Sequence, residues 1–174
     1  MSVTNKNVII TGAAGGIGRA AALAFAKNGF GVLINYRTAK DAAEKLCEEI
    51  NSQGGRAVRF KADVSVRGDV DEMTGFARRE LGAIGVLVNN AGIAQQKMFR
   101  DITEQDFDRM MGVTVKGAFN CTQAALPDMV HDKSGKIINV SSMWGVSGAS
   151  CEVHYSAAKS ALIGLTKALA RELA

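Results

Sequence analysis

The fold is decided by residues 8–18, VIITGAAGGIG, where a short apolar run leads directly into a cluster of glycines. Val8 to Ile10 are β-branched and predict a buried strand. From Ile17 to Lys27, Ala, Leu and Phe recur at helical spacing, which predicts a helix directly after the glycines. A strand, a glycine turn and a helix in this order place backbone amides and the helix dipole where they attract a pyrophosphate.

The spacing of these glycines is Gly12-x3-Gly16-x-Gly18, which departs from the GxGxxG pattern of many dinucleotide folds. Taken alone, it also fits an ordinary glycine-rich loop. Its place between a strand and a helix favours phosphate binding, because glycine lets the chain turn tightly and approach a ligand closely.

Strands and helices continue to alternate along the chain. Further strands are predicted at 31–36, 57–61, 85–88 and 136–140, and further helices at 39–50, 68–81, 104–130 and 154–174. Nearly continuous apolar strands are typical of a parallel sheet covered on both faces. We therefore predict one α/β domain over residues 1–174, a doubly wound Rossmann-like sheet that binds ligands beyond the carboxyl ends of its strands.

Composition narrows the class of protein. With 174 residues, 47% of them hydrophobic, and a single Pro, the chain predicts one soluble, compact domain. The three cysteines lack CxxC spacing, so we expect reduced thiols in a cytoplasmic protein and no metal site. No apolar run approaches the roughly 20 residues that span a bilayer, so we expect no membrane insertion. The net charge of +4 comes from scattered Lys and Arg, which predicts no nucleic acid binding.

Polar residues follow the predicted strands at the edge where a ligand would bind. Asp63 could cap the next helix or lie beside an adenine ring. Asn89 and Asn90 could be turn formers or site residues. Arg37 follows the second strand, where an NAD site usually carries an acidic residue. Arg37 would pair with a 2′-phosphate, which favours NADP over NAD, although a solvated surface arginine remains the alternative.

Tyr155 and Lys159 are four residues apart on the last predicted helix, so their side chains share one face. A nearby ammonium stabilises a phenolate and makes the tyrosine hydroxyl a better acid. Ketone reduction needs such an acid, because hydride transfer leaves an alkoxide that must take a proton. Ser142 could donate a hydrogen bond to that oxygen, and on chemistry alone Ser141 is an equal candidate. Without this context, the Tyr–Lys pair would be an ordinary surface pair.

Several of these motifs together resemble the short-chain dehydrogenase/reductase family. They are Thr11-Gly12-x3-Gly16-Ile17-Gly18, Asn89-Asn90-Ala91-Gly92, Ser142 and Tyr155-Ser156-Ala157-Ala158-Lys159. Within the family, the sequence is most similar to bacterial 3-oxoacyl-[acyl-carrier-protein] reductases. The resemblance implies NADPH-dependent reduction of a small-molecule or acyl-carrier-bound ketone, in fatty acid synthesis. A sugar, steroid or other alcohol dehydrogenase and a catalytically silent fragment are the alternatives.

The resemblance also implies a role for each matching residue. Tyr155 would donate the proton, Lys159 would assist it and hold the nicotinamide ribose, and Ser142, chosen by its distance to Tyr155, would orient the carbonyl. The implied cofactor contacts are Gly12, Ala14, Gly16, Ile17 and Gly18 at the pyrophosphate, Arg37 at the 2′-phosphate, Asp63 and Val64 at the adenine, and Asn90 at the ribose.

Three features depart from the family pattern. Thr114 stands where the family often has an Asn that supports a water leading to the lysine, and a hydroxyl holds water with fewer donors than an amide. Gly15 stands where a second, basic NADP marker is common. The chain stops at Ala174, where family members continue, so we expect the C-terminal strands to be missing. We expect a homodimer through the helices 104–130 and 154–174, and a tetramer at full length.

Overall fold

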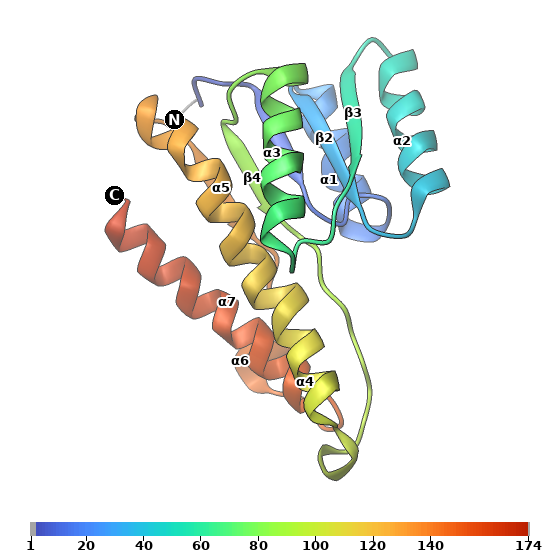
Figure 1. Ribbon diagram of the computed structural model, residues 1–174, viewed down its shortest axis with the longest axis vertical. Helices are drawn as coiled ribbons and strands as arrows, with labels where there is room; N and C mark the ends of the chain where they lie inside the picture. The colour runs from blue at the N-terminus through green and yellow to red at the C-terminus, as the bar shows by residue number, and fades with distance from the viewer. Residues whose placement is uncertain (1–2, 174) are drawn as a thin grey trace.

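The computed structural model describes residues 3–173. Five parallel strands form one sheet in the order β3-β2-β1-β4-β5. Figure 1 labels β2, β3 and β4 of this sheet. The chain runs outward from β1 to β3 and then returns to the other side of β1, so the strand order reverses between β1 and β4. Ligands of such sheets bind at this reversal. The strands are β1 (Asn7–Ile10), β2 (Gly31–Tyr36), β3 (Arg56–Lys61), β4 (Val86–Asn89) and β5 (Lys136–Asn139).

Helices cover both faces of the sheet. Alternate residues of a strand point to opposite faces, so neighbouring residues of β1 pack against different helices. Ile9 packs in a cluster with Met73 of α3 and Cys121 of α5. Its neighbour Val8 packs in a second cluster, which contains Leu46 of α2. The predicted doubly wound α/β architecture is therefore confirmed. The helices are α1 (Gly16–Lys27), α2 (Lys40–Ser52), α3 (Arg67–Leu81), α4 (Glu104–Met111), α5 (Gly117–His131), α6 (Trp144–Ser147) and α7 (Val153–Glu172).

The long helical segment predicted at 104–130 is present, and it contains a π-helical turn. After α4 the chain forms a π-helical turn, η2 (Gly112–Lys116), before α5 begins. A π turn inserts one residue into the helical repeat and so changes which side chains face inward, often beside functional sites. In this turn, Thr114 is only 1% exposed. Apolar periodicity does not reveal a one-residue insertion, so the helical segment was predicted but its π turn was not.

Two short elements were not predicted, the 3₁₀ turn η1 (Phe99–Asp101) and α6. Helix α7 ends at Glu172, and the predicted helix end at Ala174 lies outside the described residues. Among residues 3–173, no helix is long and apolar enough to cross a bilayer. Within the same range, no group of three or more His, Cys, Asp or Glu side chains is placed to bind a metal ion.

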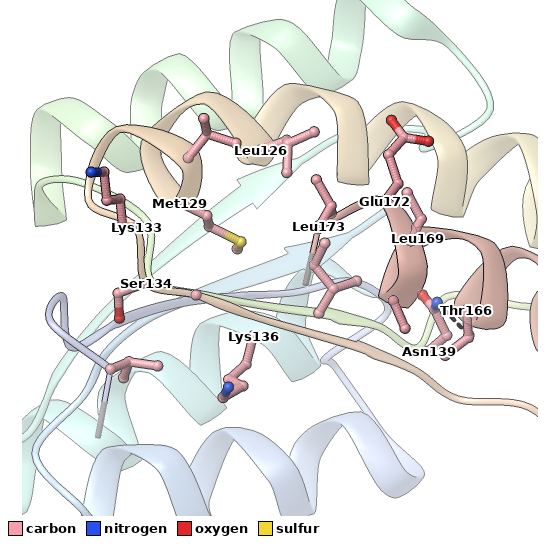
Figure 2. A pocket seen from close by; sticks show the side chains of 15 residues that line it. Leu126, Met129, Lys133, Ser134, Lys136, Asn139, Thr166, Leu169, Glu172 and Leu173 are labelled. Atoms are coloured by element: carbon pink, nitrogen blue, oxygen red, sulfur yellow. Dashed lines mark hydrogen bonds between the residues drawn. The ribbon is translucent and has the colours of Figure 1, made fainter. Parts of the chain in front are cut away.

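An open groove of about 1050 Å³ runs along the edge strand β5, between α5 and α7 (Figure 2). Its apolar lining includes Leu126 and Met129 of α5 and Leu169 of α7. Asn139 donates a hydrogen bond to Thr166 at 2.8 Å across one part of it. Within the described part of the chain, no strand pairs with the outer edge of β5.

Candidate active site

The glycine turn after β1 and the loop after β4 meet at the carboxyl edge of the sheet. Gly12 lies so close to this loop that a Cβ atom on it would be 3.0 Å from the Cα of Ala91. The next residue of the loop, Gly92, approaches the last helix, because a Cβ there would be 3.5 Å from the Nζ of Lys159. The predicted phosphate-binding turn and the predicted catalytic lysine are thus brought to one region.

Two asparagines and a threonine fix the glycine turn. Gly12 N donates to Asn35 Oδ1 at 3.1 Å. Asn90 Nδ2 donates to the carbonyl oxygens of Thr11 and Gly12, at 2.9 and 3.0 Å. Thr11 Oγ1 accepts from the backbone amides of Asn90 and Ala91, at 3.0 and 2.9 Å. The amide group of Asn90, which the sequence suggests for the cofactor ribose, therefore shapes the turn in this structure.

The turn also leaves room for a ligand. Gly12 and Gly16 have φ angles of +61° and +52°, which favour glycine, and a Cβ on Gly18 would lie 2.6 Å from Gly12 O. Gly15, the N-cap of α1, makes no side-chain cap, and a Cβ there would meet nothing within 4 Å. Uncapped amides facing open space suit an anion, so these residues fit a cofactor pyrophosphate.

The remaining residues assigned to the pyrophosphate flank this turn. Ala14 is half-buried, whereas Ile17 in the first turn of α1 is 65% exposed. An apolar side chain left in solvent beside an uncapped helix end is available for contact with a bound molecule.

Arg37 and Asp63 lie together at the ends of β2 and β3. Arg37 Nη1 is 3.5 Å from Asp63 Oδ2, and both side chains are partly exposed. Burial raises the pKa of Asp63, but hydrogen bonds from Ser65 and Arg37 outweigh that effect and hold this pKa below its ordinary value. Val64 is buried, and its carbonyl accepts from Asn120 Nδ2 at 3.0 Å. Beyond the end of β2, the Arg37 cation thus lies beside the ionised carboxylate of Asp63.

Lys159 lies beneath Tyr155 in the first turns of α7. The lysine is 5% exposed, and its Nζ donates to the carbonyl oxygen of Val140 at 2.7 Å. The same nitrogen lies 5.8 Å from the centroid of the half-buried Tyr155 ring. Desolvation lowers the pKa of Lys159 below its ordinary value of 10.5. A cationic nitrogen therefore sits beside the phenol, which is the arrangement predicted from their spacing.

The lowered pKa of Lys159 predicts a pH dependence of stability. Between its folded pKa and 10.5, the folded chain binds fewer protons than the unfolded chain, so the free energy of unfolding rises with pH. A Lys159→Met variant lacks this contribution. We expect the stability of the unmutated chain relative to the variant to increase from neutral pH toward 10.5, as measured by urea unfolding. A constant difference would contradict the burial of a charged lysine.

The two serines after β5 play different parts. Ser141 Oγ donates to the carbonyl oxygen of Lys159 at 2.8 Å, so its hydrogen is already used. Ser142 Oγ instead accepts from the backbone amide of Trp144 at 3.2 Å, which leaves its own O–H hydrogen for another acceptor. A Cβ on Gly145 would lie 2.8 Å from the carbonyl carbon of Lys159, so α6 contacts α7 at this point. The geometry favours Ser142 as the available donor.

Thr114 lies near the same loop residue as Lys159. A Cβ on Gly92 would be 3.9 Å from Thr114 Oγ1, compared with 3.5 Å from Lys159 Nζ. The Thr114 hydroxyl has a weak contact with Met110 Sδ at 4.0 Å. The π turn therefore places a buried hydroxyl and the lysine ammonium near the same residue, Gly92, at a position where the family pattern often has an amide.

Several residues with a part in this site were not singled out from the sequence. Asn35 holds Gly12, and its signal was a polar side chain inside the apolar run GVLINY. Asn120 on α5 holds the Val64 carbonyl, and nothing in its helical context pointed to that contact. Gln95 and His154 form a hydrogen bond of 2.8 Å between distant parts of the chain, which no local pattern reveals.

Residues 6–174 match the model of the short chain dehydrogenase family. The chain therefore belongs to the short chain dehydrogenases, a family of oxidoreductases, and its membership implies a nicotinamide cofactor.

Curated relatives and a solved structure agree with this family. A 3-oxoacyl-[acyl-carrier-protein] reductase of Staphylococcus epidermidis is 41% identical over 170 residues, which are 98% of this chain and 70% of the relative. A reductase of the same name from Synechocystis is 38% identical over 173 residues, 99% of this chain and 70% of the relative. The crystal structure of a short chain dehydrogenase from Mycobacterium avium superposes with a TM-score of 0.86 at 35% identity. That match covers 94% of this chain but 63% of the solved one.

Proposed function

We propose that this chain carries the cofactor-binding and catalytic site of an NADPH-dependent reductase that converts a 3-oxoacyl thioester into the 3-hydroxyacyl product. The observation that carries the proposal is the buried Lys159 ammonium beside Tyr155, next to an open glycine turn. The names of the bacterial relatives favour a substrate attached to acyl carrier protein.

The side chains at this site supply a proton to the substrate oxygen. The nicotinamide, when bound, supplies the hydride. Ser142 donates a hydrogen bond to the ketone oxygen and orients the carbonyl, because its O–H hydrogen is free. Tyr155 transfers its phenolic proton to the same oxygen as negative charge develops there. The Lys159 ammonium stabilises the resulting phenolate, and the Thr114 hydroxyl holds a water that leads to Lys159.

The chain's own groups would hold the cofactor at the carboxyl edge of the sheet. The amides of the glycine turn, with Gly16 and Gly18, bind the pyrophosphate at the N-terminus of α1. Lys159 would hold the ribose together with Asn90, whose Nδ2 is already bound to the glycine turn, and Asp63 with Val64 would border the adenine. Arg37 binds the 2′-phosphate.

Cofactor choice is expected to depend on Arg37. Binding of NADPH replaces the Asp63 carboxylate with the 2′-phosphate as the partner of Arg37, and the preference for NADPH over NADH follows from this pair. We expect Arg37→Ala to weaken NADPH binding by about tenfold or more, since a charged hydrogen bond contributes about 1.5–3 kcal/mol. The unpaired Asp63 would then also repel the phosphate. NADH binding should change little.

Fluorescence titration of both cofactors measures this effect. Arg171→Ala is the matched control, because Arg171 is an exposed arginine in the last turn of α7. Equal binding of NADPH and NADH by the unmutated chain, or a preference that survives Arg37→Ala, would show that another group selects the cofactor.

The substrate class is tested by comparing ketones. NADPH oxidation should be faster with a 3-oxoacyl thioester on acyl carrier protein than with a free 3-ketoester, a sugar or a steroid ketone. Faster turnover of a sugar or a steroid ketone would favour an alcohol dehydrogenase of the same family. The absence of turnover with every ketone, at high protein concentration, would indicate a silent fragment.

We further propose a cytoplasmic homodimer of single-domain subunits, a tetramer for a longer chain. Phe107 of α4 and Phe119 of α5 are 43% and 50% exposed, and apolar side chains on neighbouring helices favour a two-fold helical contact. Sedimentation at micromolar concentration should give the mass of a dimer, and Phe119→Asp should give a monomer. A monomeric unmutated chain would contradict this interface.

A further inference from the structure

An extended segment, residues 91–98, joins β4 to η1 and passes below the body of the sheet (Figure 1). The structure ties this segment to the four residues that precede Tyr155. Lys97 N donates to the carbonyl oxygen of Cys151 at 2.7 Å. His154 Nε2 lies 2.8 Å from Gln95 Oε1. Both contacts join the loop after β4 to the start of α7, over more than 50 residues of sequence.

Asp106 of α4 fixes the orientation of the Gln95 amide. Its Oδ1 accepts from Gln95 Nε2 at 2.9 Å, and its Oδ2 accepts from Lys97 Nζ at 2.6 Å and from Thr103 N at 3.0 Å. These hydrogen bonds, the one from Lys97 first, hold the pKa of Asp106 well below its ordinary value, so the carboxylate is ionised and only accepts. Gln95 therefore turns its Oε1 toward His154, and His154 Nε2 must be the donor.

His154 is 1% exposed and directly precedes Tyr155. Its second nitrogen, Nδ1, is buried and has no hydrogen-bond partner among the described residues. The ring is thus held by one directional bond, from Nε2 to Gln95. A buried polar ring with one bond in use makes that bond a sensitive determinant of where the start of α7 lies.

We propose that His154, Gln95 and Asp106 form a positioning clasp that sets the place of the Tyr155 hydroxyl. The expected effect of the clasp on catalysis rests on the proposed reductase function. Breaking the clasp frees the first turn of α7, and the phenol then reaches the ketone oxygen less often. The clasp touches neither the glycine turn nor Arg37, so the contacts proposed for the pyrophosphate and the 2′-phosphate do not depend on it.

Four single variants test the clasp. His154→Leu and Gln95→Met each remove the hydrogen bond between α7 and the loop. Each replaces a polar side chain with an apolar one of similar volume. His154→Gln restores a donor near the Nε2 position, and it loses no bond at Nδ1 because none is made there. Gln96→Met is the matched control, since Gln96 is exposed and makes only a long bond of 3.4 Å to Glu152.

We expect kcat to fall about tenfold or more in His154→Leu and Gln95→Met, because small errors in placing a catalytic group are costly. NADPH affinity should stay within about twofold. His154→Gln should recover most of the lost kcat, and Gln96→Met should match the unmutated chain. If His154 and Gln95 had only a structural role, the variants would lower the stability of the chain, and kcat would not fall while NADPH affinity stayed the same. Unaltered kcat in both clasp variants, or no recovery in His154→Gln, would overturn the proposal.

Amide hydrogen exchange separates the clasp from the proposed function. Residues 95–98 and 152–156 should exchange faster in His154→Leu and Gln95→Met, and at the original rate in His154→Gln. If the unmutated chain reduces no ketone, faster exchange still supports the clasp while the reductase function fails. Unchanged exchange overturns the clasp whatever the activity. If His154→Leu does not fold, Gln95→Met decides, because Gln95 is a half-buried loop residue.

Discussion

Replacing Tyr155 with Phe is expected to lower kcat for ketone reduction by roughly two to four orders of magnitude, the usual contribution of a positioned acid. The change removes one hydroxyl from a half-buried ring and leaves Lys159 in place. NADPH affinity and the unfolding temperature should therefore change little. Steady-state rates and fluorescence titration of the same preparation measure the two effects separately.

Ser141→Ala is a useful control for this experiment. Ser141 lies close to the site, but its hydroxyl is bound to the carbonyl oxygen of Lys159. The variant should lose about 1 kcal/mol of stability, as for a typical hydrogen bond, and keep most of its kcat. If Tyr155→Phe retained more than about a tenth of the original kcat, the tyrosine could not be the main proton donor.

Adding a methyl group at Gly18 is expected to abolish tight cofactor binding. A Cβ there would lie 2.6 Å from both Gly12 O and Asn90 Nδ2, and 2.9 Å from the Cα of Ala13. Two of these contacts are backbone atoms, so the turn itself must move. Such overpacking costs about 1–3 kcal/mol, which corresponds to roughly 5- to 150-fold weaker NADPH binding when the displaced turn is the binding site.

Gly164→Ala is the matched control for Gly18→Ala. Gly164 is an exposed residue of α7 outside the glycine turn, and a Cβ at this position meets nothing within 4 Å. The variant should fold normally and bind NADPH with nearly the original affinity. A Gly18→Ala chain that binds as tightly as Gly164→Ala would show that the cofactor does not depend on this turn.

The architecture could be predicted because the local spacing of apolar residues indicates each strand and helix. Runs such as VIITG and GVLINY are apolar and bounded by turn residues, and the helices between them repeat apolar side chains every three or four residues. The π turn at Gly112–Lys116 could not be predicted in this way, since a one-residue insertion leaves the composition of the helix unchanged. The turns at Phe99–Asp101 and Trp144–Ser147 are too short to carry a period.

In the candidate site, too, features that depend on neighbouring residues could be predicted, whereas contacts between distant residues could not. Tyr155 and Lys159 were recognisable because one helical turn separates them in the sequence. Ser141 and Ser142 were equal on chemistry alone, and only the hydrogen bond from Ser141 to Lys159 O separates them. The contacts of Asn35 and His154 join residues 23 and 59 positions away, so they depend on how the chain folds back on itself.

The most direct test of the account follows the hydride. The chain is incubated with a 3-oxoacyl thioester and NADPH that carries deuterium at both C4 positions of the dihydronicotinamide, and the product is analysed by mass spectrometry. We predict a 3-hydroxyacyl thioester with one deuterium on its carbinol carbon, formed in step with cofactor oxidation and lost in Tyr155→Phe. Cofactor oxidation without a deuterated alcohol, or alcohol formation at the full rate in Tyr155→Phe, would contradict the account.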